Sequence, residues 1–558
     1  MTRSKAARII LLGSSCLFTA LLTTAHAGSL PSGGTVVGGS ATITSGGNST
    51  VINQSSDKAI INWTDFSIAV GNSVTFNQPG SNSIALNRVL GSTPSNIDGS
   101  LFANGHVWLI NGNGVLFGKG AQVNVGSLIA TTADMNNQDF LNGNYKFGSA
   151  SSNPNAGITN NGTLRANHGS IVLAGPVVAN NGIIQADTGN VVLGGVSTFT
   201  VDFTGDNLLR FAVGTPVQQT PNDANGHPVK ALVSNTGTIS AKGGRVLMTT
   251  RAAESVVNNV INNTGMVEAT SVSMKNGEVV LDAGDGSVED SGTIDVSGKN
   301  AGETGGTITV QAKTITVADG AKMDASGDAG GGAIMIGGDA HGQGTVQHAQ
   351  TTTVGHAALN ADAISNGNGG KIVVWSDGQT TFAGSASARG GAHGGDGGFV
   401  ETSGHHLAVA TGATVNTSSL FGNAGTWLLD PDNIVIEQGG EDGLDANGND
   451  NIENNPDGTD FIDPDTITAA LANGNVRLEA ANDISVYDDI IYSSSNSLSL
   501  LAEHSINVLA DIQNQLATGG GGINLIAGWD GQTRDLAKLT NPGVFGNGFG
   551  AVIVGGEG

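Results

Sequence analysis

Side chains that could bind a metal or transfer a proton are sparse in this sequence. The densest group is His405 and His406, which follow Glu401 by four and five residues. Adjacent residues of a β-strand point to opposite faces, so the two histidines cannot bind one ion unless the chain turns between them. No cysteine or further histidine stands at the spacing of a zinc site. We therefore predict no metal site here and expect both histidines in a surface turn.

Acidic residues are concentrated in one segment and basic residues are scarce, a distribution that disfavours catalysis. Residues 430–465 hold twelve Asp and Glu and no Lys or Arg, whereas a glycosidase sets its two carboxylates around one scissile bond. His341, His348 and His356 are seven and eight residues apart, and we expect them to face solvent. The sequence predicts no catalytic residue, no cofactor and no enzymatic activity. A polysaccharide-active enzyme stays open as an alternative, because β-solenoids also host such enzymes.

The acidic segment leaves a calcium site open. Asp445, Asn447 and Asn449 match the first ligands of an EF-hand, but Asp450 replaces its glycine and Pro456 its last glutamate. An EF-hand is therefore excluded. A looser calcium site stays open as an alternative, because many oxygen ligands lie close together.

The backbone that must position these groups is rich in glycine. Gly accounts for 87 of 558 residues, while aromatic residues make up 4% and charged residues 12%. Together with many Val, Ile, Thr and Asn residues, this composition favours many short strands joined by tight corners over one compact enzyme core. The regular spacing of Val, Ile and Leu argues against disorder.

The first 27 residues are typical of a secretory signal peptide. A basic head precedes an apolar run over 9–22, and Ala25-His26-Ala27 forms a small-x-small cleavage site, so we expect cleavage after Ala27. Cys16 lies within this segment, so the mature chain has no cysteine and must be held by packing alone. Removing three basic residues lowers the formal net charge from −25 to −28. Such a charge excludes nucleic acid as a partner bound through bulk electrostatics.

From about residue 156 the sequence repeats itself. The copies at Asn160 and Asn180 are 20 residues apart, and those at Asn235 and Asn263 are 28 apart. A shorter copy begins at Ser291, which follows Thr264 by 27 residues. A period of 20–30 residues with several short strands and Asn/Gly corners predicts a β-solenoid, whose stacked coils share one core. If residues 30–430 hold about 16–20 coils, the shaft is roughly 75–95 Å long at about 4.8 Å per coil.

Residues 107–118 show the same pattern in its shortest form. Two apolar runs flank Asn111-Gly112-Asn113-Gly114, and Val115 starts the second run. Asn and Gly tolerate positive φ, so this break predicts a sharp corner between two buried strands.

This stretch belongs to a series of spaced motifs that resembles one known family. In chain order the motifs are Asp65-Phe66-Ser67-Ile68, Val74-Thr75-Phe76-Asn77-Gln78-Pro79, Leu86-Asn87-Arg88-Val89, Asn96-Ile97-Asp98-Gly99-Ser100-Leu101, residues 107–118 and Phe140-Leu141-Asn142-Gly143-Asn144-Tyr145. Over roughly residues 30–150 the chain resembles the secretion domain of filamentous-haemagglutinin-like exoproteins of two-partner secretion systems. The family signature Asn-Pro-Asn-Gly-Ile is changed here, with Gly112 for Pro and Val115 for Ile. A companion Asn-Pro-Asn-Leu motif is absent, and Asn153-Pro154-Asn155-Ala156 lies too late to replace it.

Later segments resemble the shafts of large exoproteins of this kind. They cover residues 369–376, 388–391, 397–403 and 425–431. Their tryptophans, Trp375 and Trp427, are expected to pack in the core or at coil edges.

The resemblance implies a right-handed parallel β-helix, all-β, with short extra β elements near the N-terminus. It also implies a secreted or surface-exposed protein of a Gram-negative bacterium, exported by the Sec machinery and then by a cognate outer-membrane β-barrel transporter with periplasmic repeat domains. The shaft would be an adhesin for a host or neighbouring cell surface. Alternatives are a haem- or haemoprotein-capture exoprotein and a toxin-carrier fragment. The resemblance also implies the residues for transporter recognition and folding, which are Asn87, Arg88, Asn111, Gly112, Asn113, Gly114 and Val115.

The expected division of the chain follows from these boundaries. Residues 1–27 are the signal peptide, 28–150 the secretion domain and 151–429 the shaft. An acidic loop or hinge covers 430–466, and a further strand-rich solenoid segment covers 467–558.

Overall fold

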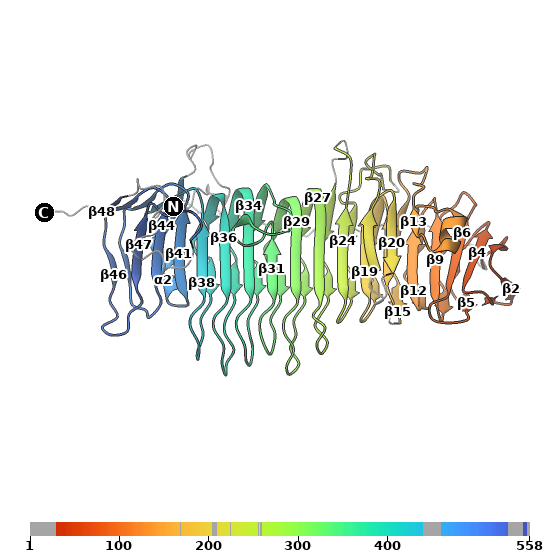
Figure 1. The fold of residues 1–558 in the computed structure, drawn as a ribbon. Coiled ribbons are helices and arrows are strands. Elements are labelled where there is room, and N and C mark those ends of the chain that lie inside the picture. Colours follow the sequence, from red (N-terminus) through yellow and green to blue (C-terminus); the bar gives the residue numbers. More distant parts are fainter. Residues whose placement is uncertain are drawn as a thin grey trace, which may run out of the picture.

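The strands of the chain stack into one long β-helix, with the first coils at one end and the last coils at the other (Figure 1). The computed structural model describes residues 30–167, 169–203, 209–223, 225–254, 256, 259–438, 459–533 and 551–554. Strands of successive coils pair in parallel along most of the stack. The parallel β-helix expected from the sequence is confirmed.

One column of strands runs the full length of the shaft. It contains β4 (Lys58–Trp63), β6 (Ile84–Val89), β9 (His106–Asn111), β12 (Ser127–Thr131), β16 (Ile171–Gly175), β19 (Asn190–Gly195), β24 (Arg245–Thr250), β27 (Glu278–Asp290), β29 (Thr307–Val317), β31 (Ala333–Ile336), β34 (Lys371–Phe382), β36 (Phe399–Val409), β38 (Thr426–Asp430), β41 (Asn475–Ala480), β44 (Leu498–Ala502) and β47 (Ile523–Ala527).

A second column joins the first because β27, β29, β34 and β36 extend into both. Its other members are β7 (Ser95–Ile97), β10 (Val115–Phe117), β14 (Gly157–Asn160), β17 (Val177–Asn180), β22 (Val233–Asn235), β25 (Val260–Asn263) and β32 (Thr351–Val354). A separate five-stranded sheet toward the C-terminus contains β39 (Asn433–Ile436), β40 (Thr459–Ile462), β42 (Ile484–Val486), β45 (Ile506–Val508) and β48 (Val552–Val554).

The third column is a 14-stranded sheet. It contains β2 (Ala41–Gly46), β3 (Ser49–Gln54), β5 (Ser73–Asn77), β8 (Ser100–Ala103), β11 (Gln122–Val125), β15 (Thr163–Ala166), β18 (Ile183–Gln185), β23 (Thr238–Ser240), β26 (Met266–Glu268), β28 (Thr293–Asp295), β30 (Lys322–Asp324), β33 (Ala358–Asn360), β35 (Ser385–Ser387) and β37 (Thr414–Asn416). A two-stranded sheet of β43 (Ile490–Tyr492) and β46 (Ile512–Asn514) lies nearer the C-terminus.

Fourteen strands are fewer than the 16–20 coils expected over residues 30–430, and they span roughly 60 Å at the usual strand spacing. The coils are longer than expected because some carry insertions. Asn180 pairs with Asn235, 55 residues later, and the intervening chain forms two extra strands. In the middle coils, loops project beyond the stack on one side (Figure 1).

The core of the shaft follows from strand alternation. Inward residues of stacked strands align, as in Ile171 with Val191 and Leu173 with Leu193, and all four are fully buried. One cluster of such side chains continues from Ile52 to Val508. Each coil alone would expose these side chains, so the stacking of coils is what buries them.

A buried asparagine ladder crosses five coils of the second column. Each amide nitrogen donates to the side-chain oxygen of the next coil at 2.8 Å from Asn160 through Asn180 and Asn235 to Asn263. Asn263 then donates to Oδ1 of Asp290 at 2.7 Å. The repeat of Asn/Gly corners found in the sequence thus corresponds to a physical ladder, with the Asn side chains inside the coil corner.

Extra elements cover one outer face of the first coils. The antiparallel strands β13 (Lys146–Phe147), β20 (Phe199–Phe203) and β21 (Leu209–Val213) form a small sheet, and helix α1 (Asn137–Asn142) lies nearby. Trp108 on the outer face of β9 packs among them, with ring centroids 5.5 Å from Phe140 and 4.7 Å from Tyr145. Strand β1 (Thr35–Gly38) pairs antiparallel with β4, and β2 pairs antiparallel with β3. The extra β elements expected near the N-terminus are therefore present.

The C-terminal coils continue the first column, because β38 pairs in parallel with β41. The expectation that strands resume from residue 467 is wrong in one detail. Helix α2 (Pro464–Leu471) comes first, with Asp463 as its N-cap and Pro464 in its first turn, and these are helix-start signals. The expected loop of 430–466 contains β39 and β40, and its possible calcium ligands at 445–449 lie outside the described residues. Among the described residues, neither α1 nor α2 nor any other helix is long and apolar enough to span a membrane.

Candidate functional site

The corner at residues 111–114 is a closed turn between β9 and β10. Gly114 N donates to the Asn111 carbonyl at 2.9 Å, and Asn113 N donates to Asn111 Oδ1 at 2.9 Å. Gly114 has φ of 108°, and a Cβ there would lie 2.8 Å from the carbonyl oxygen of Gly157. Glycine at 114 is therefore required both by the backbone conformation and by the close approach of the next coil.

Asn111 ties this turn to the coil before it. Its side chain is fully buried, and Nδ2 donates to the Thr93 carbonyl and to Ser95 Oγ, both at 3.0 Å. Asn113 makes a similar link, because its Nδ2 donates to the carbonyl of Gly91 at 3.0 Å. The two asparagines thus satisfy backbone groups that the preceding corner would otherwise bury without partners.

The next coil closes over the turn from the other side. Ser151 Oγ donates to the Gly112 carbonyl at 2.5 Å, and Val115 pairs with both Ser95 and Ile158. Val115 is 2% exposed. The turn is held between two coils, so most of its polar groups serve packing and are not available to an external partner.

Asn87 lies inside the β-helix. It is fully buried; its Oδ1 accepts from Trp63 Nε1 at 3.0 Å, and its Nδ2 donates to the carbonyls of Ala85 and Trp108. A buried amide costs free energy unless it is hydrogen-bonded. Asn87 therefore fixes the position of the Trp63 ring within the core of the first coils.

Arg88 points to the opposite face, where the extra elements lie. Its Nε donates to both carboxylate oxygens of Asp134 at 2.8 and 3.0 Å, and Nη1 and Nη2 donate to Asn137 Oδ1 and the Met135 carbonyl. Arg88 is 8% exposed. It therefore anchors the segment that leads into α1 against β6.

The expected site residues come together in space but divide into three environments. Strand β6 pairs with β9, which sets Val89 beside Asn111, yet Asn87 faces the core, Arg88 faces the extra layer, and residues 111–115 form the corner. Sequence reasoning missed Trp108, which organises the aromatic cluster outside β9. The cleavage residue Ala27 lies outside the described residues.

His106 at the start of β9 adds a titratable group beside this layer. Burial lowers the pKa of His106 to about 4, and its ring lies 5.8 Å from that of Phe203. The imidazole is consequently neutral at neutral pH and acts as part of the packed layer.

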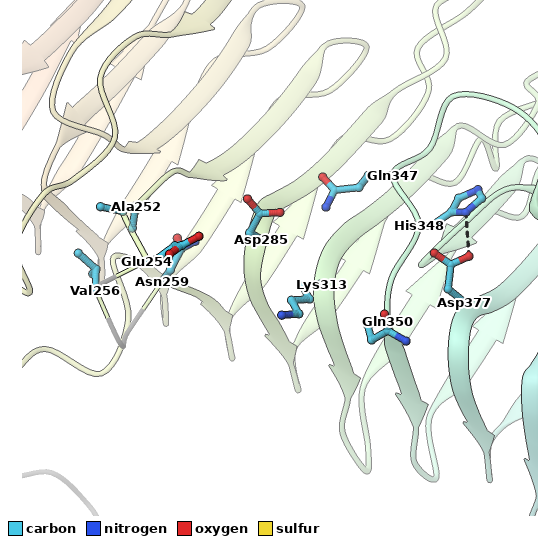
Figure 2. Close-up of a pocket in the computed structure, with 11 residues that line it drawn as sticks. Ala252, Glu254, Val256, Asn259, Asp285, Lys313, Gln347, His348, Gln350 and Asp377 are labelled. Carbon is cyan, nitrogen blue, oxygen red and sulfur yellow. Dashed lines mark hydrogen bonds and ion pairs between the residues drawn. The ribbon is translucent and has the colours of Figure 1, made fainter.

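A polar groove of about 680 Å³ crosses several coils farther along the shaft (Figure 2). Its lining includes Glu254, Asn259, Asp285, Lys313, Gln347, Gln350 and Asp377. His348 lies at one end, where its Nδ1 is 3.1 Å from Asp377 Oδ1. The groove offers hydrogen-bond donors and acceptors from separate coils, so it suits a polar ligand better than an apolar one.

The histidines singled out by the sequence fall in different surroundings. His405 is exposed and contacts Asp432 at 2.9 Å, while His406 lies 3.9 Å from Asp460, so the two contact different carboxylates. Both belong to β36, so the expected surface turn is wrong. The pairing of β36 with β34 shifts its register between Gly404 and His406, where β36 passes from one column to the other. His356 is largely exposed, but His341 is half-buried against Phe399 and does not face solvent as expected.

The two tryptophans pack as the sequence predicted. Trp427 is 2% exposed, and its Nε1 donates to Thr402 Oγ1 at 3.1 Å. The ring of Trp375 lies at the outer surface of β34 beneath a loop, 4.4 Å from the ring of His348.

Comparison with protein families matches residues 27–296 to the TPS secretion domain. The expected domain end at residue 150 stays a prediction. Two curated relatives are both described as heme/hemopexin-binding protein, one from Haemophilus influenzae strain Rd (ATCC 51907) and one from Haemophilus influenzae. The first is 33% identical over 270 residues, which cover 47% of this chain and 28% of the relative. The second is 34% identical over 255 residues, which cover 42% of this chain and 26% of the relative. The matched region is thus less than a third of each relative.

A solved structure matches more of the chain. The crystal structure of the HMW1 secretion domain from Haemophilus influenzae has a TM-score of 0.62 and 32% sequence identity to this protein, and the match covers 72% of this chain and all of that domain. The likeness therefore includes the whole of the solved domain and continues beyond the range of the family match.

Proposed function

Because the chain belongs to the TPS secretion domain family, whose members are secreted to the cell surface of Gram-negative bacteria, we propose that its first coils direct its export. Membership also implies a cognate outer-membrane transporter as partner. We assign the recognised part to residues 28–150, with Asn87, Arg88 and residues 111–115 as the groups that make it competent.

The buried corner at 111–114 carries this proposal. Asn111 is fully buried and bonded to the coil before it, and Gly112 is bonded to the segment that leads into the next coil. A group enclosed in this way contributes to recognition through the fold that it stabilises. We propose that Asn111 and Asn113 act in folding of the first coils, and that the transporter contacts surfaces which depend on that folding.

The route that we propose has two stages. The Sec machinery moves the chain to the periplasm, and periplasmic repeat domains of the transporter then receive residues 28–150. The mature chain contains no cysteine, so no disulfide would hinder threading in an unfolded form. Stacking of coils outside the cell buries apolar side chains progressively, and this supplies a free-energy gradient in the outward direction.

The experiment that tests the proposal uses an Asn111→Ala/Asn113→Ala double variant in cells that express the transporter. We expect loss of the protein from the surface and medium, with detectable protein in the periplasm. The matched control is Asn48→Ala/Asn82→Ala, because both asparagines lie in the same domain and are exposed. Normal secretion of the Asn111/Asn113 variant would contradict the assigned role.

For the exported shaft we propose an adhesin that presents its outer faces to a host or neighbouring cell surface, without enzymatic activity. The structure supports this through an elongated stack with projecting loops (Figure 1) and the polar groove of Figure 2. Cells that display the protein should adhere to surfaces that carry the receptor more strongly than cells that lack it. Equal adherence across a panel of host and bacterial surfaces would count against an adhesin.

A second function, capture of haem or of a haem-carrying protein, is favoured by the description of the two curated relatives. The match covers 28% and 26% of those relatives, so their binding activity can reside in parts outside it. Titration of the purified exported protein with haem distinguishes the two functions. A saturable absorbance shift supports haem capture, and a binding experiment with haemopexin tests capture of the carrier protein.

A further inference from the structure

Three side chains with metal-ligand chemistry converge on the outer face of the first strand column, away from the export domain. They are His341 in the short 3₁₀ turn η1 (Ala340–Gly342), Asp430 at the end of β38, and Glu479 in β41. One ligand atom from each lies within 4.8 Å of the other two. The three residues are far apart in sequence, so this cluster exists only once the coils are stacked.

Strand pairing explains why the two carboxylates meet. Leu429 of β38 pairs with Leu478 of β41, and both leucines are fully buried inside the β-helix. Successive side chains of a strand alternate between faces, so Asp430 and Glu479, each one residue later, both lie on the outer face of adjacent strands. Glu479 is fully buried there. Like charges on neighbouring strands repel each other unless a cation lies between or beside them.

The loop that carries His341 is fixed over this face. Lys371 Nζ donates to Asp339 Oδ1 at 2.5 Å, and Asp339 also accepts from Ala340 N. His341 N donates to both carboxylate oxygens of Glu401 at 2.9 and 3.0 Å. These bonds hold the backbone on both sides of the imidazole.

The ring of Trp375 packs against the backbone of the same loop. Gly338 and Gly342 approach its ring so closely that a Cβ at either position would lie within 2.8 Å of a ring atom. The side chain of His341 is thus carried by an anchored segment, and a preorganised ligand loses little entropy when it binds an ion.

The local charge favours a cation. Arg477 forms an ion pair with Glu479, and its guanidinium carbon lies 5.9 Å from the ring centre of Trp529. Asp430 lies in the same cluster as Glu479, and Glu401 contributes a third carboxylate, which accepts from His341 N. Carboxylates gathered at a buried face are stabilised when a positive charge approaches them.

We propose that His341, Asp430 and Glu479 bind one divalent transition-metal ion, with Zn²⁺ as the reference ion. An imidazole nitrogen with two carboxylate oxygens suits zinc and its neighbours, whereas calcium and magnesium prefer oxygen ligands alone. Three protein ligands leave a fourth position for water in a tetrahedral zinc site.

Such an ion would connect three separate parts of the shaft: the η1 loop, the coil of β38 and the coil of β41. Because the ligands assemble only in the stacked form, metal binding would stabilise the folded shaft over the unfolded chain. The proposed site would therefore hold the C-terminal coils against the main shaft.

The test uses the purified exported protein at full length, first treated with EDTA and then dialysed. Titration calorimetry with zinc chloride, together with metal analysis after desalting, should give one zinc per chain, and zinc should raise the midpoint of thermal unfolding. An excess of calcium should not displace it. Absence of stoichiometric zinc, or its displacement by calcium, would overturn the proposal.

Two variants locate the binding. His341→Ala and the isosteric Asp430→Asn should each weaken zinc binding more than roughly tenfold and remove the zinc-dependent thermal shift. His356→Ala is the matched control, because His356 is exposed and also lies beside a carboxylate, that of Asp319. Circular dichroism of the metal-free variants shows whether the β-helix is intact. Zinc binding of wild-type strength in folded His341→Ala would overturn the assigned ligands.

Discussion

At the scale of single residues, Asp290 ends the buried asparagine ladder with a carboxyl group where four preceding coils hold amides. It accepts from Asn263 through Oδ1, while Oδ2 has no hydrogen-bond partner among the described residues. The residue that follows in the stack is Val317, which offers no polar side chain. Burial raises the pKa of Asp290 to about 6, even though the bond from Asn263 acts in the opposite direction.

The raised pKa has a defined consequence for stability. The folded state holds the proton up to about pH 6, whereas the unfolded chain releases it near 3.8. The contribution of Asp290 to stability is therefore greatest below pH 4, and it is lost as pH rises from about 4 to 6. At pH 7 the ionised carboxylate costs roughly 3 kcal/mol by this linkage.

We predict that Asp290→Asn stabilises the shaft at neutral pH. The amide can accept from Asn263 as the carboxylate does, and it carries no charge into the core. The gain in unfolding free energy over the wild type should grow from near zero at pH 4 to about 1–3 kcal/mol at pH 7. Urea unfolding of both proteins at several pH values measures this difference, in which the contribution of His106 cancels. A difference that does not vary with pH would contradict the assignment.

Gly112 gives the second prediction at this scale. It occupies the second position of a closed turn, where proline is favoured, and Asn111 before it ends an extended strand, as a residue before proline prefers. A Cβ at 112 would have Ser151 Oγ, 3.7 Å away, as its nearest contact. Gly112→Pro should therefore stabilise the first coils by about 0.4–1 kcal/mol, measured by urea unfolding.

The neighbouring glycine should behave in the opposite way. Gly114 has a left-handed φ and lies against the backbone of Gly157, so Gly114→Ala should destabilise the same coils by about 1–3 kcal/mol. The pair of substitutions separates the two glycines of the corner. Destabilisation by Gly112→Pro would show that the turn differs from the one described.

At the scale of elements, Arg88 connects the β-helix to the layer outside it. Its guanidinium bonds to Asp134, Asn137 and the Met135 carbonyl, and these precede or begin α1. Asp134 is 41% exposed in its side chain, so solvent screens part of the interaction.

We predict that Arg88→Ala loosens this layer while the β-helix remains folded. The loss should be about 1–3 kcal/mol, as for hydrogen bonds to a charged group. Faster hydrogen exchange of residues 132–147 than in the wild type is the measurement, and exchange in β16 and β19 should be unchanged. Arg165→Ala is the control, because Arg165 is exposed and bonds only to Gln185 in the described structure. Unchanged exchange at 132–147 would contradict the anchoring role.

The elements that the sequence predicted well are those in which local pattern and stacking agree. The repeated Asn/Gly corners predict the alignment of Asn160 with Asn180 and of Asn235 with Asn263 correctly, because each coil repeats the environment of the last. The sequence does not predict helix α2, because Pro464 and Asp465 belong to an acidic stretch that favours a loop, although Asp463-Pro464 is also a helix start. The sequence does not predict the outer aromatic layer. Trp108 lies in an apolar strand and is expected to face the core, and only the folded structure shows the aromatic side chains that cover it on the outer face.

In the candidate site, too, the sequence predicts what is set locally and not what depends on the neighbouring coil. The corner at 111–114 could be predicted, because Asn and Gly specify a turn locally. The partners of Asn111, Thr93 and Ser95, could not, because they depend on which coil lies beside it. The convergence of His341 with two carboxylates is less predictable still, since it requires the register of β38 on β41 and the path of a separate loop.

At the scale of the whole molecule, the shaft is a one-dimensional stack in which each coil contacts its neighbours. The free energy of unfolding is then approximately a sum of contributions from single coils and from the interfaces between neighbouring coils. Damage to one interface therefore lets the parts on either side unfold separately. Glycines at one row of corners bring the coils into close contact: a Cβ at Gly332, Gly370 or Gly398 would lie 2.0–2.1 Å from a carbonyl oxygen of the preceding coil. These corners cannot accept a side chain unless the stack opens.

Gly370→Ala should therefore divide the shaft without stopping export. The added methyl would meet Gly332 O at 2.0 Å, and the substitution lies beyond residues 27–296, the part of the chain that matches the family model. We expect secreted protein whose urea unfolding resolves into two transitions, and limited proteolysis should cut near residue 370 and leave an N-terminal fragment protected. Gly522→Ala is the control, because its nearest contact would be 3.9 Å away. If the Gly370→Ala protein instead stayed in the periplasm and was not secreted, coil stacking beyond residue 296 would be part of the export step itself.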